Sequence, residues 1–284
     1  MSFLLPFHRK PIVTAVSIVA ALSAWLPCGR AQIVNLSSGN SAASVNLGSQ
    51  AGMDSWTING QNQLNQQWFW YRIDNDPTGQ HSIDTIGAPV VNANGNSVDA
   101  VYTSAGLFSL DITYTLNGGN PGTWTSDITE NISISNLSGS ALNFHFFQYS
   151  DFALAGSSGG ETAAIFQNGG FFSKANVTKG PNGLSETIDQ PLANEAEADL
   201  GTATLSRLNQ GSPYTLNNSL GSGPDPNLDA TWALEWDFTI DVNGSVDVIK
   251  DKKLSVAPIP EPTALSLALL GAGAFILRRK RLPA

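Results

Sequence analysis

The chain has a single cysteine and few positive charges, and each shortage excludes a class of function. Cys28 lies in a segment that we expect to be removed on export, so the mature chain would lack disulfides, zinc–thiolate sites and cysteine nucleophiles. Residues 32–256 contain seven Lys and Arg against 22 Asp and Glu, a net charge of −15. Because so acidic a surface repels polyanions, we expect no nucleic-acid partner and no direct adhesion to anionic lipid.

The first 31 residues are typical of a secretory signal peptide. A cationic start at residues 8–10 precedes an uncharged apolar run at residues 12–26, and the small residues Gly29 and Ala31 favour cleavage after Ala31. A lipid-modified Cys28 is the alternative, although the residues just before it are not the small and aliphatic ones of a lipoprotein signal. We therefore expect an exported protein.

The ectodomain, residues 32–256, has 225 residues, which is enough for a sizeable core. Its apolar residues alternate with polar ones, which is the period of a β-strand. Residues 108–116 and 124–135 are clear cases, and Glu130 interrupts the apolar face of the second. Many short alternating segments with frequent turns, and no fixed-period repeat, predict an all-β fold, an antiparallel β-sandwich.

Two turns predict β-hairpins and one segment predicts a helix. Asn243-Gly244 and Asn168-Gly169-Gly170 each separate two alternating runs, and these residue types tolerate the positive φ of a tight hairpin. Residues 194–208 could carry a short helix, because acidic residues stand near the start, two leucines share a face and a glycine follows.

The C-terminal 27 residues join three features in a defined order. A Pro-Glu-Pro tripeptide at residues 260–262 is followed by an uncharged stretch that ends at Leu277 and then by four consecutive cations. The 16 residues from Pro262 to Leu277 would span about 24 Å as a helix, against about 30 Å for a bilayer core. The apolar run by itself leaves a permanent tail anchor and a transient sorting signal equally open.

This arrangement resembles a PEP-CTERM sorting signal. The matching positions are Pro260, Glu261 and Pro262, a short transmembrane helix at residues 263–277, and the stop-transfer cluster Arg278, Arg279, Lys280 and Arg281. The resemblance implies processing by exosortase, a membrane-embedded enzyme, after a transient stay in the inner membrane. It also implies release to the cell envelope or extracellular matrix, with extracellular polysaccharide as a candidate partner. We thus expect a signal peptide (1–31), an ectodomain (32–256) and a sorting signal (257–284).

One stretch of the ectodomain is strongly aromatic and could bind sugar. Trp68 and Trp70 would share one face of a strand, with Tyr71 on the other, and aromatic faces stack on sugar rings. These three residues form a candidate sugar platform. Ordinary core packing is the alternative, since buried aromatic residues are common core material.

Two acidic segments, Asp74-Asn75-Asp76 and residues 241–247, could offer oxygens to Ca²⁺. Neither matches an EF-hand loop, and turn formation by Asp and Asn explains both.

Two histidines and one pair of carboxylates are the remaining candidates. His81 and His145 are far apart in the sequence, which gives little support for a metal site or a catalytic triad. Glu235 and Asp237 would lie on the same strand face, where they could imitate the paired carboxyls of a glycosidase. We nevertheless expect both to be solvated surface carboxylates.

From the sequence we expect a non-enzymatic surface or extracellular-matrix protein, with no catalytic residue, metal or cofactor. This expectation depends on the two export signals and on the lack of an H-E-x-x-H motif. The first alternative is a carbohydrate-binding module that acts on exopolysaccharide through the candidate sugar platform. The second is a polysaccharide-active enzyme, motivated only by Glu235 and Asp237.

Overall fold

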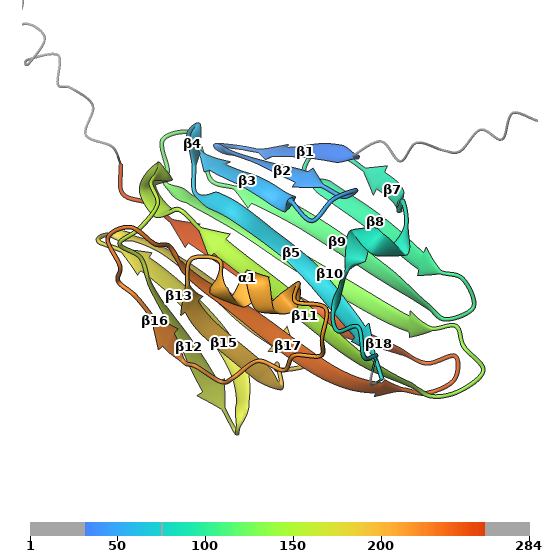
Figure 1. Cartoon of the computed structure of the whole chain (residues 1–284). Helices are drawn as coiled ribbons and strands as arrows, with labels where there is room; N and C mark the ends of the chain where they lie inside the picture. Colours follow the sequence, from blue (N-terminus) through green and yellow to red (C-terminus); the bar gives the residue numbers. More distant parts are fainter. Residues whose placement is uncertain (1–31, 75, 259–284) are drawn as a thin grey trace, which may run out of the picture.

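The computed structural model describes residues 32–74 and 76–258, which form the ectodomain (Figure 1). The expected signal peptide, the Pro-Glu-Pro tripeptide, the helix at residues 263–277 and the basic cluster lie outside the described residues. Within the described ranges, no helix is both long and apolar enough to cross a membrane.

Two nine-stranded sheets pack face to face and confirm the expected antiparallel β-sandwich (Figure 1). Sheet A has the order β1-β2-β3-β5-β11-β17-β15, with β4 paired to β3, β6 paired to β5, and a short parallel contact between β3 and β5. Its strands are β1 (Ile33–Ser38), β2 (Ser41–Asn46), β3 (Gly52–Ile58), β4 (Gln61–Asn62), β5 (Leu64–Ile73), β6 (His81–Ser82), β11 (Leu142–Phe152), β15 (Glu195–Leu200) and β17 (Ala230–Ile240).

Sheet B has the order β16-β12-β13-β14-β18-β10-β9-β8-β7. Its strands are β7 (Val90–Ala93), β8 (Ser97–Ser104), β9 (Phe108–Gly118), β10 (Thr125–Asn136), β12 (Thr162–Asn168), β13 (Phe171–Lys179), β14 (Asn182–Gln190), β16 (Gly221–Ser222) and β18 (Ser245–Ser255). The helical segments among the described residues are short. They are η1 (Ile83–Ile86), η2 (Leu154–Gly156) and α1 (Ala203–Leu208).

The alternation of the sequence places the core between the two sheets. Along β9, every second side chain from Phe108 to Leu116 is buried, and the residues between them are only partly covered. Each large apolar side chain buried in this way stabilises the fold by about 1.5–3 kcal/mol. β12 and β13 pair across Asn168-Gly169-Gly170, which confirms the hairpin expected at that turn.

The middle of sheet A is buried on both faces. Sheet B covers the inner face, and α1 with the segment that follows it covers part of the outer face (Figure 1). The burial patterns of β5, β11 and β17 accordingly show long runs of consecutive buried residues instead of strict alternation. A candidate site on this outer face is therefore bordered by a folded segment of the same chain.

The hairpin expected at Asn243-Gly244 is wrong, because the turn joins the two sheets. β17 already lies between β11 and β15 in sheet A, whereas β18 lies between β14 and β10 in sheet B. Asn243 has a φ of 59°, and the N–H of Gly244 donates to the Asp241 carbonyl at 2.8 Å. The tight turn exists as expected, but both edges of β17 are occupied, so the next strand enters the opposite sheet.

The helix expected at residues 194–208 is wrong over its first half. Residues Glu195–Leu200 form β15, which pairs with β17 from Glu195↔Glu235 to Leu200↔Ala230, and only Ala203–Leu208 are helical. Pairing with a long buried strand outweighs the weak helix signal of a segment that has no side-chain cap at its start.

Glu130, which interrupts the apolar face of β10, belongs to a buried ionic cluster between the sheets. Lys250 and Lys252 of β18 donate to its two carboxylate oxygens at 2.6 and 2.5 Å, and Lys252 also lies 3.2 Å from Glu186 of β14. All four side chains are fully buried. Burial opposes ionisation of Glu186, but the two lysines outweigh that effect and lower its pKa.

Candidate functional site

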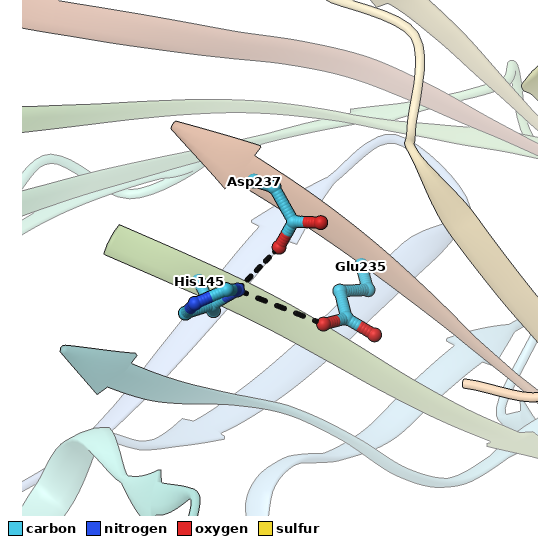
Figure 2. A group of neighbouring side chains, drawn as sticks. All are labelled: His145, Glu235 and Asp237. Atoms are coloured by element: carbon cyan, nitrogen blue, oxygen red, sulfur yellow. Dashed lines mark hydrogen bonds and ion pairs between the residues drawn. The ribbon is translucent and has the colours of Figure 1, made fainter. Parts of the chain in front are cut away.

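A histidine and two carboxylic side chains meet on the outer face of sheet A (Figure 2). His145 of β11 lies directly opposite Asp237 of β17, and Glu235 lies two residues earlier on β17, hence on the same face. The residues come from segments 92 positions apart in the sequence, and the pairing of β11 with β17 brings them together.

The ring of His145 lies between the two carboxyl groups. Its Nδ1 forms a hydrogen bond with Oδ1 of Asp237 and lies 3.9 Å from Oε1 of Glu235, as Figure 2 shows. The side chains of His145 and Asp237 are 22% and 38% exposed, whereas that of Glu235 is 0% exposed. Asp237 thus orients an imidazole that solvent can reach, with Glu235 enclosed beside it.

Glu235 is the fully buried member of this site. Its Oε2 accepts a hydrogen bond from the backbone N–H of Leu216 at 2.9 Å, and its Oε1 has no hydrogen-bond partner. Burial, only partly opposed by the Leu216 hydrogen bond, raises the pKa of Glu235 to about 8. The carboxyl group therefore holds a proton at neutral pH, which corrects the expectation of a solvated surface carboxylate.

A row of polar side chains borders the exposed part of the site. The Asn143 amide donates to Oδ1 of Asp74 at 3.0 Å, and the Thr239 hydroxyl donates to Oδ1 of Asn143 at 2.9 Å. Together with His145 and Asp237, these residues line a shallow hollow of about 270 Å³. Carboxylate, amide and hydroxyl groups in one row can exchange hydrogen bonds with the hydroxyls of a sugar.

The same three side chains also provide donor atoms for a cation. One atom each from His145, Glu235 and Asp237 lies within 4.8 Å of the others, which is close enough for a single divalent ion. From the sequence we expected no metal site, and no sequence pattern indicated that these three side chains would lie together. Because burial raises the pKa of Glu235, a cation that bound here would displace its proton.

Trp68 and Trp70 of the candidate sugar platform are fully buried, so the structure does not place them where a sugar could stack. The indole N–H of Trp68 donates to Ser82 at 2.9 Å, and that of Trp70 donates to Asn209, just after α1, at 3.1 Å. Tyr71 faces the other side of β5 and stacks on Phe144, with ring centroids 5.9 Å apart. The alternative of core packing accounts for all three.

The two acidic segments behave as turns. Asp76 accepts hydrogen bonds from the N–H and hydroxyl of Thr78 at 2.9 and 2.6 Å and lies 3.0 Å from His81. The Thr78 hydrogen bonds, with help from His81, lower the pKa of Asp76 to about 2. Asn75 lies outside the described residues, and the segment from Asp241 forms the turn between the sheets.

No family model matches the chain, and no curated protein matches it in sequence. Its fold is similar to that of solved sugar-processing enzymes. A protein assigned as an aldose 1-epimerase from Escherichia coli K12 aligns with a TM-score of 0.50 at 9% identity, covering 80% of this chain and 99% of that chain. A galactose mutarotase related enzyme from Lactobacillus acidophilus aligns with a TM-score of 0.52 at 8% identity, covering 81% and 100%.

A third similar structure is a bacterial glucoamylase in complex with acarbose. It aligns with a TM-score of 0.52 at 9% identity over 86% of this chain, which corresponds to 36% of the glucoamylase chain. At such low identity, the three likenesses establish a shared fold. They do not transfer the activity or the site residues of the other proteins to this chain.

The expectation of a non-enzymatic surface protein, with a carbohydrate-binding module as its alternative, is wrong. The described residues have a fold shared with an aldose 1-epimerase-like protein and a galactose mutarotase related enzyme. No sequence motif marks the candidate site, because His145 and Asp237 meet only through strand pairing, 92 positions apart. The spacing of Glu235 and Asp237, two residues apart on one strand, was the one local sign of the site. The site is complete only when the neighbouring strand places His145 beside them.

Proposed function

We propose that the ectodomain is a sugar-processing enzyme that interconverts the anomers of an aldose by proton transfer. One observation carries this proposal: the proton-holding carboxyl of Glu235 lies 3.9 Å from the ring of His145, which Asp237 orients. A carboxylic acid kept neutral beside an imidazole gives the site an acid and a base at the same pH. The fold shared with an aldose 1-epimerase-like protein supports this reaction class.

In this reaction, His145 removes the proton from the anomeric hydroxyl while Glu235 donates its proton to the ring oxygen. The bond between the anomeric carbon and the ring oxygen breaks, leaving an open-chain aldehyde, an imidazolium and a carboxylate. Rotation about the bond next to the aldehyde presents its other face. The reverse proton transfers then close the ring as the opposite anomer and restore both side chains, so no proton is gained or lost.

Asp237 has a supporting role in this scheme. Its hydrogen bond to Nδ1 of His145 leaves Nε2 as the nitrogen that faces the sugar. The same hydrogen bond stabilises the imidazolium that forms. The scheme also requires the sugar to reach Glu235, whose side chain is fully buried beneath the segment that carries Leu216. That segment must move aside when a sugar binds.

The test is the rate of anomer exchange, measured by polarimetry or by NMR exchange spectroscopy on D-galactose and D-glucose. Glu235→Gln keeps the neutral shape of the carboxyl but has no proton to donate, so we expect kcat/KM to fall by about 10²–10⁴-fold. Asp247→Asn, on the outer face of sheet B, is the matched control and should leave the rate unchanged. Equal rates for the wild type, Glu235→Gln and His145→Gln would contradict the proposal.

We also propose that this enzyme is exported and processed at its C-terminus. The proposal is supported by the signal-peptide pattern of residues 1–31 and by the Pro-Glu-Pro, apolar and basic order of the tail. It includes exosortase as the processing partner, with the cell envelope or the extracellular matrix as the destination. Mass spectrometry of the mature C-terminus tests it, since an intact Ala284 on the surface-located protein would contradict processing.

A further inference from the structure

Acidic side chains predominate around the hollow beside His145. Asp74 and Asp237 both line it, from the end of β5 and from β17. Glu195 of β15 lies opposite Glu235 on the next strand and acts on that carboxyl as a further negative neighbour. Three acidic side chains besides Glu235 therefore surround one small site.

The nearest cation does not face into this hollow. Arg72 lies opposite His145 on β5, but its side chain is buried, its Nη1 donates to the Tyr214 carbonyl at 2.9 Å, and its guanidinium lies 5.7 Å from the centre of the Phe147 ring. These two contacts hold the Arg72 side chain under the segment that carries Tyr214 and Leu216, so it does not point toward a bound sugar.

The other six cations among residues 32–74 and 76–258 have partners or positions elsewhere. They are Lys250 and Lys252 beside Glu130 between the sheets, Lys179 beside Glu161, Arg207 beside Glu197 and Asp199, and Lys174 and Lys253 on strands of sheet B. Within the described part of the chain, no basic side chain lines the hollow. Arg72 acts on Glu235 as a positive neighbour, but a carboxylate or phosphate on the substrate would find no cation among the described residues that line the hollow and would lie close to Asp74 and Asp237.

We infer that the hollow selects an amino sugar, whose ammonium group pairs with Asp74, over sugars that carry a carboxylate or a phosphate. The inference deepens the proposed function and rests on it for the identity of the site. A second feature also indicates a ligand here: Oε1 of the fully buried Glu235 has no hydrogen-bond partner and points toward His145 at the side of the hollow. An unpaired buried oxygen is a costly arrangement that a bound hydroxyl would satisfy.

The polar row fits the rest of such a ligand. Asn143 and Thr239 lie on adjacent strands, and each can exchange hydrogen bonds with a sugar hydroxyl. Asp74 lies at the far end of this row, held by the Asn143 amide at 3.0 Å, so its second oxygen remains available for an ammonium group. The row therefore places the charge selection at Asp74, apart from the proton transfer at His145.

The experiment compares three sugars of similar size, D-glucosamine, N-acetyl-D-glucosamine and D-glucuronate, with the full chain at low salt. Dissociation constants are measured by ligand-observed NMR, and anomer exchange is measured for each sugar in parallel. At neutral pH we expect glucosamine to bind about fivefold more tightly than N-acetyl-glucosamine, the factor of an exposed ion pair, and glucuronate to bind most weakly. The preference should shrink as salt is added.

The matched variant is Asp74→Asn, which keeps the oxygen that accepts from Asn143 and suits the positive φ of 47° at this position. It should abolish the preference for glucosamine, and the control Asp247→Asn should keep the preference. Equal affinities for the three sugars, tighter binding of glucuronate, or no binding at all would each overturn the inference. If the three sugars bind in the expected order of affinity but none shows enzyme-dependent anomer exchange, the proposed function is overturned and the charge selection is retained.

Discussion

The ammonium nitrogen of Lys250 lies 2.6 Å from Oε2 of Glu130, and both side chains are fully buried between the two sheets. The same nitrogen lies 5.0 Å from the centre of the Phe69 ring and 5.7 Å from that of Trp236. Aromatic faces and one shared carboxylate thus replace the water that a lysine normally binds. The pair is retained inside the core only because both of its charges are compensated.

Removal of one carboxylate from this cluster should destabilise the whole sandwich. In Glu130→Gln, Lys250 and Lys252 would share the single charge of Glu186, from which they lie 3.5 and 3.2 Å. We expect the free energy of unfolding to fall by about 3–5 kcal/mol, as for other broken buried ion pairs. Urea denaturation followed by tryptophan fluorescence measures it, with Asp247→Asn as the surface control. A loss below about 1 kcal/mol would show that the lysines find other partners or lose their protons.

Trp70→Ala should destabilise the fold instead of specifically weakening sugar binding. Trp70 is fully buried and donates its indole N–H to Asn209, so the change leaves a cavity and removes one of the two hydrogen bonds that the Asn209 amide oxygen accepts. The expected loss is about 3–5 kcal/mol in thermal or urea unfolding. Trp70→Phe, which retains most of the ring volume, should cost much less. Sugar affinity lost in Trp70→Ala with unchanged stability would restore the candidate sugar platform.

The alternation of apolar and polar residues was sufficient to predict the sandwich and several of its strands. It could not assign partners to the strands. Asn243-Gly244 makes the tight turn that its residues favour, yet the direction of the next strand depends on which edges of β17 are free. Residues 195–200 form a strand because β17 offers an edge to them, which no local signal reveals.

The candidate site was unpredictable for the same reason. Alternation places Glu235 and Asp237 on one face, but their chemistry depends on His145, 92 positions from Asp237, and on Leu216, whose segment covers Glu235. Glu130 likewise looked like a break in the pattern, because the lysine that neutralises it lies 120 positions away. Contacts of this range come from the pairing of strands that are far apart in the sequence.

Glu261→Ala should separate export from processing. Glu261 is the only charge between Lys253 and Arg278, and the prolines on both sides favour an extended conformation. A charge-assisted hydrogen bond from exosortase to this carboxylate would contribute about 1.5–3 kcal/mol to recognition. We expect the variant to be exported but to accumulate in an unprocessed, membrane-bound form. Deletion of residues 278–281 is the comparison variant. It should impair the arrest of the chain in the membrane, not the cleavage at the tripeptide. Normal trimming of Glu261→Ala, seen by mass spectrometry, would argue against recognition of the tripeptide.

Above the ordinary pKa of a carboxyl group, the stability of the protein should decrease as pH rises, and Glu235 should account for the alkaline part of that decrease. Its pKa is raised from 4.5 to about 8 by burial, so the folded state prefers the protonated form. Below pH 4.5 the group is protonated in both the folded and the unfolded state. Between the two pKa values the unfolded chain releases the proton and the folded chain keeps it. The free energy of unfolding therefore falls, on the order of 5 kcal/mol in all, until the folded group also ionises near pH 8.

Other groups contribute to the same trend at lower pH. The pKa values of Asp111, Asp127 and Asp151 are each raised to about 6, chiefly by burial, so their contribution ends near neutrality. Glu235→Gln keeps a neutral side chain that can still accept from Leu216, so it should remove only the alkaline part. The wild type should lose stability between pH 7 and 9 in urea titrations, while the variant should stay level over that interval. Parallel curves for the two proteins from pH 7 to 9 would mean that Glu235 is already ionised in the folded state, and its role as the acid would then be excluded.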